Sequence, residues 1–336
     1  MQNRQILLSS RPEGWVTNDN FAVEETGVPA IGEGQVLVRA VYLSVDPYLR
    51  GRMNDTKSYI PPFQLGSPVD SGIVGQVIES RFDGLSEGDY VLGRLPWALI
   101  SAASGAELVK LNADIAPLSY NLGILGMPGQ TAWVGLKAVA NLQEGENVFV
   151  SGASGAVGQV VGQIAKNMGC HVAGSAGGAE KVAYLRDLGF DAAIDYKATP
   201  NLFGAVADAC PNGIDVHFEN VGGAILEAVI NKLNFKARIA LCGYITAYNS
   251  KIEELPPGPR NLPILIGTGA RMEGFIVTQY PAECMEWVKT GAKWLKEGKL
   301  QYKETVVEGL ENAPDAFIGM LKGENMGKMI VKIADE

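Results

Sequence analysis

The pattern of apolar and polar positions divides the chain into two kinds of segment. Between residues 147 and 277, short β-branched runs alternate with stretches in which apolar residues recur every three or four positions. The series begins with NVFV at 147–150 and the helical pattern AVGQVVGQIAKNMG at 156–169, and it continues to RMEGFIV at 271–277. An alternation of strand and helix predicts an α/β fold with a parallel, doubly wound Rossmann sheet.

The first third of the chain has a different pattern. GQVLVRAVYLSVDPYLRGRM at 34–53, DSGIVGQVIESRFDGLSEGDYVLGR at 70–94 and GAELVKLN at 105–112 are short strand-like runs separated by Gly, Pro and Asp. They predict an antiparallel, barrel-like domain. The tail from residue 299 shows strand, helix and strand without a further βαβ unit, so we expect it to return to this β-rich domain.

These patterns predict two domains, one of residues 1–122 with 299–336 and one of residues 123–298. A long amphipathic helix at 281–298 is expected to pack through one face, made of Cys284, Trp287, Val288, Gly291 and Trp294 or Leu295. The proline cluster ELPPGPRNLP at 254–263 is expected to be either a stiff loop at an active site or a plain connector.

Composition excludes several classes of protein. A chain of 336 residues, 47% of them apolar and 19% charged, is typical of a compact two-domain enzyme. Its net charge of -9 opposes binding to nucleic acid or anionic lipid, which requires clustered Lys and Arg. No run approaches the ~18 apolar residues of a membrane span, so we expect neither nucleic acid nor membrane as a partner.

The cysteines and histidines indicate a reducing compartment and no metal. Cys170, Cys210, Cys242 and Cys284 are widely spaced and form no CxxC pair, and the first residues lack the pattern of a secretory signal, so we expect a cytoplasmic protein. The chain has 2 histidines, His171 and His217, and neither has a second ligand at metal-binding spacing. We expect both to be packed or surface imidazoles, and no reaction through a zinc alkoxide.

The segment SGASGAVGQ at 151–159 carries the clearest chemical signal. It follows a predicted strand and opens a predicted helix, and Gly155 and Gly158 have the spacing that lets a pyrophosphate approach the backbone. Ala153 stands where the first glycine of the dinucleotide fingerprint is usual, and Gly152 beside it is expected to take the tight turn. Amide groups of Ala156 and Val157 at the helix start complete a predicted diphosphate site.

The end of the second strand favours NADP over NAD. An NAD site places Asp or Glu about 20 residues beyond the loop, but this chain has Ser175, Ala176, Gly177 and Gly178 there. Lys181, in the first turn of the next helix, is expected to meet a 2'-phosphate, with an exposed helix lysine as the alternative. Tyr196, at the end of the third strand, is a second candidate, although a tyrosine at this boundary is as often structural.

Six strings in the same order resemble a known family. SVDPYLRGRM, GMPGQTAW, SGASGAVGQ, GAEKVAYLRDLGF, FENVGG and GLENAPDAFIGMLKGENMGKMIVK are similar to the zinc-free medium-chain dehydrogenase/reductases. Within them the chain resembles the leukotriene and prostaglandin reductase branch, and most of all the bacterial NADPH-dependent curcumin reductases, which share PPGP, AGGAEK and LENAP. The resemblance implies a GroES-like catalytic domain built from both chain ends, a Rossmann domain, a homodimer and reduction of α,β-unsaturated ketones with NADPH.

The resemblance also implies roles for particular residues. It supports Lys181 and Tyr196 at the 2'-phosphate, and it adds a further set of cofactor-binding residues: Met127, Thr131, Asn220, Cys242, Gly243, Tyr244, Ile245, Phe275, Ile276, Val277 and Asn325.

The implied chemistry requires a group that stabilises negative charge on the carbonyl oxygen when hydride adds to the β-carbon of an enone. One candidate donor is the ribose 2'-hydroxyl of the cofactor, and the others are Tyr48, Tyr59 and Tyr248, of which we favour Tyr248 and Tyr59. For each tyrosine the alternative is that its phenol packs on an apolar wall. Tyr248 is counted among the cofactor-binding residues as well. Two other functions stay open, an NADPH quinone oxidoreductase and a cofactor-binding structural or regulatory protein without turnover.

Overall fold

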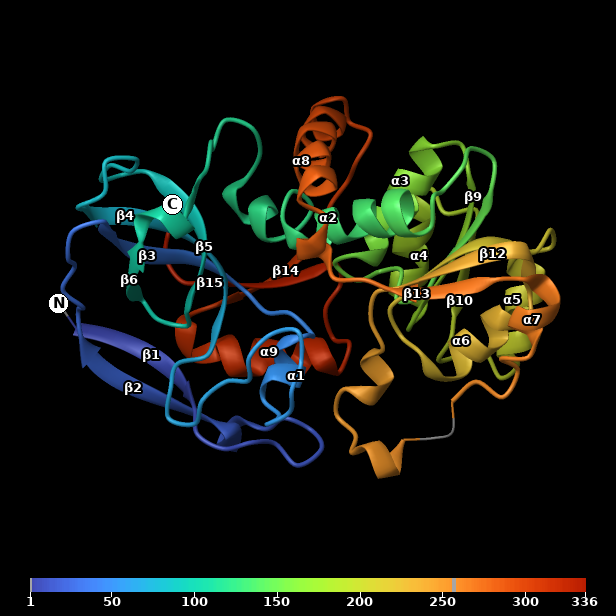
Figure 1. The fold of residues 1–336 in the computed structure, drawn as a ribbon, viewed down its shortest axis with the longest axis horizontal. Coiled ribbons are helices and arrows are strands. Elements are labelled where there is room, and N and C mark those ends of the chain that lie inside the picture. Colours follow the sequence, from blue (N-terminus) through green and yellow to red (C-terminus); the bar gives the residue numbers. More distant parts are fainter. Residues whose placement is uncertain (1, 256–257) are drawn as a thin grey trace. The chain divides into compact units, whose positions relative to one another are not determined.

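The computed structural model of the protein describes residues 2–255 and 258–336. The chain forms two compact units. Unit 1 contains residues 1–122, 304–325 and 329–336, and unit 2 contains residues 123–303 and 326–328. Both ends of the chain therefore belong to unit 1 (Figure 1).

Unit 2 contains the predicted parallel sheet. In the described residues its strands lie in the order β10-β9-β8-β11-β12-β13, and every neighbouring pair is parallel. The strands are β8 (Asn147–Val150), β9 (His171–Ala176), β10 (Ala192–Asp195), β11 (Ile214–Glu219), β12 (Leu233–Leu241) and β13 (Arg271–Gly274). The chain runs outward from β8 in one direction and then from β11 in the other, which confirms the doubly wound sheet.

Five helices of the described chain pack against strands of this sheet (Figure 1): α3 (Gly158–Asn167), α4 (Ala179–Asp187), α5 (Leu202–Ala209), α6 (Gly223–Ile230) and α7 (Ile264–Thr268). Helix α2 (Met127–Val134) packs against α3, and α8 (Pro281–Lys296) packs against α2. The periodicity of α3 is confirmed, since Val160, Val161 and Ile164 are all fully buried. Gly162 of the same helix faces the Phe190 ring, where a Cβ atom would come within 2.0 Å of it.

Unit 1 is rich in β-strands. Its strands are β1 (Gln2–Leu8), β2 (Phe21–Gly27), β3 (Gln35–Ser44), β4 (Asp70–Ser80), β5 (Tyr90–Pro96), β6 (Ile100–Ser104), β7 (Val109–Lys110), β14 (Glu304–Glu308) and β15 (Lys328–Lys332). β3 pairs antiparallel with β4, β6 and β15, so a strand of the tail joins the sheet formed by the first third of the chain. Helix α9 (Ala313–Leu321) contributes Phe317 to the core, where its ring lies 6.3 Å from that of Trp97.

Two local expectations were wrong. The segment at 34–53 does not stay extended, because helix α1 (Leu49–Arg52) follows β3 and buries Leu49 completely. In α8, Trp287 and Gly291 are buried as expected, but Val288 is 41% exposed. Trp294, predicted on the same face, is half-buried and stands edge-on to Trp133 and Trp287.

The proline cluster at 254–263 is only partly described, since Pro256 and Pro257 lie outside the described residues. A short 3-10 helix, Ile252–Glu254, precedes it and α7 follows it. Within the described parts of the chain, none of the helices has the length and apolar character needed to cross a membrane.

Candidate functional site

The candidate site lies at the carboxyl edge of the unit 2 sheet, meaning the segments that directly follow β8 to β13. At the end of β8, Gly152 has φ 57° and so makes the left-handed turn expected of it. Ala153 is not among the residues with positive φ, its side chain is buried, and its N–H donates to the Ser175 oxygen at 2.9 Å. The glycine that the fingerprint usually has at this position is therefore not needed at residue 153 of this chain.

Helix α3 begins directly against this loop. A Cβ atom on Gly158 would lie 2.5 Å from the Gly152 oxygen and 2.7 Å from Ala153 Cα, which is too close for any side chain. In the first turn of α3, the Val160 and Val161 N–H groups donate to the Val157 oxygen at 3.0 Å, and the Gln159 N–H donates to the Gly155 oxygen at 3.1 Å. The helix dipole is positive at this end, which faces the loop. A glycine loop followed by a helix start is the type of geometry that suits an anionic diphosphate.

Two lysines and a tyrosine gather at the ends of β9 and β10. A Cβ atom on Gly177 would lie 2.8 Å from the Tyr196 hydroxyl and 2.9 Å from Lys197 Cε, so both side chains lie over this glycine. Burial lowers the pKa of Lys181, and the positive charge of Lys197 lowers it further. The acid Glu180, beside them in the sequence, is exposed. This group of cations and a hydroxyl suits a doubly charged anion.

The ends of β8, β11 and β12 are joined by hydrogen bonds. Asn220 Nδ2 donates to the Ser151 oxygen at 2.8 Å, and the N–H groups of Cys242 and Gly243 donate to the Glu219 oxygen at 2.9 and 3.0 Å. The N–H of Ile245 donates to the Asn220 oxygen at 3.2 Å. The structure therefore joins Asn220 to the glycine loop segment, since Ser151 and Asn220 lie 69 positions apart in the sequence.

Two tyrosines follow β12 along this edge. The Tyr244 hydroxyl accepts the Gly223 N–H at 3.2 Å, and the Tyr248 hydroxyl accepts the Tyr244 N–H at 3.3 Å. Burial raises the pKa of Cys242 to about 12, and the charge of Glu219 acts in the same direction, so its thiol stays neutral. Tyr248 is half-buried, and its hydroxyl lies next to Gly243, where a Cβ atom would be 3.3 Å from it.

The remaining predicted residues of unit 2 lie on α2 and after β13. Phe275 stands edge-on to Phe218 with ring centroids 6.3 Å apart, and Ile276 and Val277 follow it. Helix α2 packs against the 3-10 helix Val277–Gln279, and it carries Thr131 and the 38% exposed Met127.

Tyr48, Tyr59 and Asn325 belong to unit 1. Tyr48 is packed against the core of that unit, and burial raises its pKa, so its phenol is neutral. Tyr59 is 62% exposed. Asn325 directly precedes the segment 326–328, in which the Gly327 N–H donates to the Ser154 oxygen of the glycine loop at 2.9 Å.

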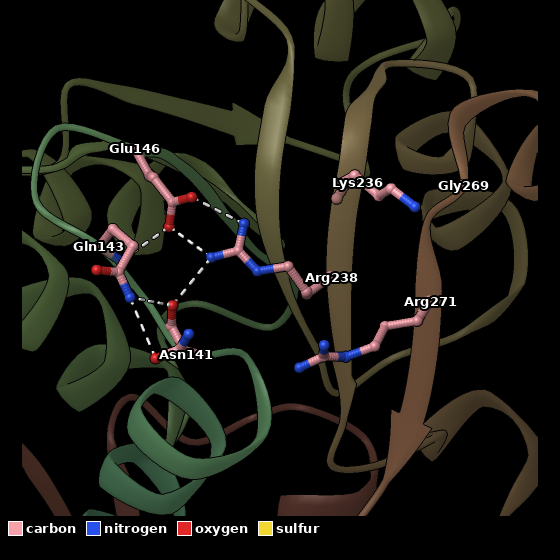
Figure 2. Close-up of a pocket in the computed structure, with 8 residues that line it drawn as sticks. Asn141, Gln143, Glu146, Lys236, Arg238, Gly269 and Arg271 are labelled. Atoms are coloured by element: carbon pink, nitrogen blue, oxygen red, sulfur yellow. Dashed lines mark hydrogen bonds and ion pairs between the residues drawn. The ribbon is translucent and has the colours of Figure 1, made fainter.

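A polar pocket of about 520 Å³ lies at the other end of the same sheet, where β12 and β13 begin (Figure 2). Arg238 donates there to Glu146 at 2.6 Å and to the Ala140 oxygen at 2.7 Å, so its charge is already neutralised. Lys236 points away from this pair towards Gly269. Because its charged groups do not converge, this pocket is not part of the candidate site. A second pocket, in unit 1, contains Asp70 and Arg94 and none of the predicted residues.

Comparison with known proteins agrees with this geometry. Residues 4–111 match the family described as the N-terminal domain of oxidoreductase, and residues 156–293 match the zinc-binding dehydrogenase family. The chain is 46% identical to the NADPH-dependent curcumin reductase of Escherichia coli, covering 100% of this chain and 98% of that protein. It is 43% identical to prostaglandin reductase 1 of Rattus norvegicus, covering 99% of both chains. The chain belongs to the medium-chain dehydrogenase/reductase family.

A solved member of this family has the same fold along the whole chain. The crystal structure of CurA from Vibrio vulnificus in complex with NADPH superposes with a TM-score of 0.93 at 43% identity, covering 99% of this chain and 100% of that one. The resemblance drawn from the six sequence strings is confirmed by these matches.

The zinc in the family description does not fit this chain. In the parts that the structure describes, no three His, Cys, Asp or Glu side chains are grouped so that they could hold a metal ion. His217 is buried, with its ring nitrogens at 3.0 Å from the Phe149 oxygen and 2.8 Å from Glu219. His171 begins β9 and is half-buried.

Sequence analysis missed two residues of the candidate site. Lys197 directly follows Tyr196, and its place next to a predicted phosphate contact was the only signal available. Glu219 precedes Asn220, but nothing in the local spacing shows that its carboxylate meets Ser151, 68 positions earlier, at 2.6 Å.

The contact between α3 and the loop predicts the effect of one methyl group. We expect Gly158→Ala to lower the melting temperature by several degrees, because overpacking of this kind costs about 1–3 kcal/mol. Gly267→Ala, in α7 and with open space around its Cα, is the matched control and should leave the melting temperature unchanged or raise it. Equal melting temperatures for the two variants would contradict the tight contact. Differential scanning calorimetry measures both.

Proposed function

We propose that this chain uses NADPH to reduce the C=C bond of α,β-unsaturated ketones, without a metal. The main support is the near-complete match to relatives named for reduction of curcumin, prostaglandins and 2-alkenals, the last from Nicotiana tabacum at 41% identity. Curcumin and 2-alkenals share a C=C bond conjugated to a carbonyl group. We propose that unit 1 is the catalytic domain and unit 2 the nucleotide-binding domain.

In this proposal the cofactor lies along the carboxyl edge. The glycine loop and the start of α3 bind the diphosphate, and Lys181, Tyr196 and Lys197 bind the 2'-phosphate. Asn220, Gly243 and the segments at 244–245 and 275–277 line the other half, with Met127, Thr131 and Asn325 beside it. When bound there, NADPH supplies the hydride.

The residues of the chain then stabilise the charge that reduction places on the substrate. Addition of hydride to the β-carbon moves negative charge onto the carbonyl oxygen, and a hydroxyl donor at that oxygen lowers the barrier. We propose Tyr248 as the first donor, because it lies on the segment that also carries Gly243, and Tyr59 as the second. A tyrosine with a pKa near 10 is protonated at neutral pH and can donate.

We also propose that the protein is a cytoplasmic homodimer. β13 is the last strand of its sheet in the described chain, and Arg271 and Glu273 on it are exposed. If two copies of β13 pair antiparallel about Met272, each Arg271 lies opposite a Glu273, and the edge strand is covered. Light scattering should then give twice the chain mass of 35.7 kDa.

Turnover with different acceptors tests the reaction itself. We expect the purified protein to consume NADPH with a diarylheptanoid enone and to release the saturated ketone, identified by mass spectrometry. Faster consumption with a simple quinone, without formation of saturated ketone, would favour a quinone oxidoreductase. Tight NADPH binding without turnover on a broad panel of enones would favour a protein without catalysis.

The lysines at the ends of β9 and β10 should determine the choice of cofactor. We expect Lys181→Ala and Lys197→Ala each to raise the KM for NADPH about tenfold and to leave that for NADH nearly unchanged, since NADH lacks the 2'-phosphate. Lys166→Ala is the matched control, because this lysine pairs with Asp191 at 2.9 Å away from the cluster. Equal losses with both cofactors would remove the phosphate role. Steady-state kinetics with the two cofactors measure this.

Replacing each tyrosine by phenylalanine should show which hydroxyl contributes to kcat. We expect Tyr248→Phe to lower kcat about a hundredfold, as loss of an oxyanion donor does, and to leave the KM for NADPH within about twofold. Tyr59→Phe should lower kcat less, because its side chain is more exposed. Tyr48→Phe should have little effect, since this phenol packs in the core of unit 1. A large loss of kcat for Tyr48→Phe alone would transfer the role to that residue.

A further inference from the structure

A buried acid and base lie beneath the candidate site and have no part in the proposed chemistry. His217 and Glu219, on β11, both have fully buried side chains. Ser151, at the end of β8, is fully buried as well. Ionisable side chains are rarely buried to this extent unless each one is paired.

The hydrogen bonds define where the protons lie. His217 Nδ1 lies 3.0 Å from the Phe149 carbonyl oxygen, which can only accept, so Nδ1 carries a proton. Oε1 of Glu219 accepts from Ser151 Oγ at 2.6 Å, from the Val221 N–H at 2.5 Å and from the Gly222 N–H at 2.9 Å. Three donors on one oxygen stabilise the ionised carboxylate.

The other carboxylate oxygen then requires a second proton on the imidazole. Glu219 Oε2 lies 2.8 Å from His217 Nε2, and when the carboxylate is ionised Nε2 is the donor of this bond. Burial acts to raise the pKa of Glu219, but the charge of His217 and the hydrogen bonds outweigh it and hold that pKa below its usual value. Cys242, whose pKa is raised by burial and by the charge of Glu219, is neutral.

We propose that His217 and Glu219 form a buried imidazolium–carboxylate pair that positions the carboxyl edge of the sheet. The carboxylate binds the turn at 221–222 directly and the end of β8 through Ser151. The same Ser151 hydroxyl accepts the Asn220 N–H at 2.8 Å, and the main-chain oxygen of Glu219 accepts from Cys242 and Gly243. Residues 217 and 219 are therefore positioning residues, and their effect on cofactor binding rests on the function proposed above.

The protonation of His217 can be observed without any cofactor. Because the chain has 2 histidines, labelling with ¹⁵N-histidine gives two sets of ring signals, and His171→Gln identifies which set belongs to His217. At pH ~7.5 we expect both ring nitrogens of His217 to show the shifts of protonated nitrogen. A single protonated nitrogen on His217 at this pH would overturn the charged pair, whether or not the protein reduces enones.

The positioning effect is tested with two graded variants. We expect Glu219→Gln to weaken NADPH binding about tenfold, measured by calorimetry, because its amide N–H₂ replaces one acceptor oxygen. In turnover this should appear in the KM for NADPH, with kcat at saturation within about twofold. Ser151→Ala keeps the charged pair and removes one of its bonds, so it should weaken binding about threefold.

The controls separate this proposal from the proposed function. If Glu219→Gln does not fold, the affinity of Ser151→Ala for NADPH decides the positioning role. His171→Gln is the negative control and should bind NADPH as the unaltered chain does. Folded Ser151→Ala and Glu219→Gln proteins with unaltered NADPH affinity would overturn the positioning role. If the unaltered chain binds NADPH but reduces no enone, the proposed function fails, while the affinity and NMR results still decide this proposal.

Discussion

The close approach of helix α3 to the glycine loop is the constraint on which the rest of the candidate site depends. A side chain at position 158 would meet the Gly152 oxygen, so the helix can begin where it does only because that residue is glycine. The contact places the positive end of the α3 dipole at the carboxyl edge. Alanine is accepted at position 153 because Gly152 makes the left-handed turn. The methyl group of Ala153 packs over Gly174, where a Cβ atom added to the glycine would lie 2.7 Å from it.

Local charge matters more at this site than the charge of the whole chain. The net charge is -9, yet Lys181 and Lys197 lie close enough for one to lower the pKa of the other. Two neighbouring ammonium groups repel each other, and a bound phosphate removes that repulsion. The acidic balance of the rest of the surface is compatible with this. Salt at ordinary ionic strength screens charges that lie more than about 10 Å away, whereas a phosphate contact is short.

Much of the fold and part of the site were predictable because their signals are local. A strand, a glycine turn and an amphipathic helix follow one another in a single stretch, so the parallel sheet, the loop at 152–158 and the position of Lys181 could be inferred from spacing. Val288 was misplaced because the helical period assigns it to the apolar face of α8, while packing of Trp133, Trp287 and Trp294 decides how wide that face is. Lys197 and Glu219 were missed because their partners lie on other strands.

By itself, the sequence determined the alternation of strands and helices, the place of the tight turn and the set of side chains at the strand ends. These depend on backbone conformation and hydrophobic period, which act over a few neighbouring residues. Only the tertiary structure decided which of those side chains meet, as when Ser151 meets Glu219 and when Tyr196 and Lys197 meet at Gly177. The reason is physical: the order of strands in a sheet is set by packing between distant segments, and no local preference specifies it.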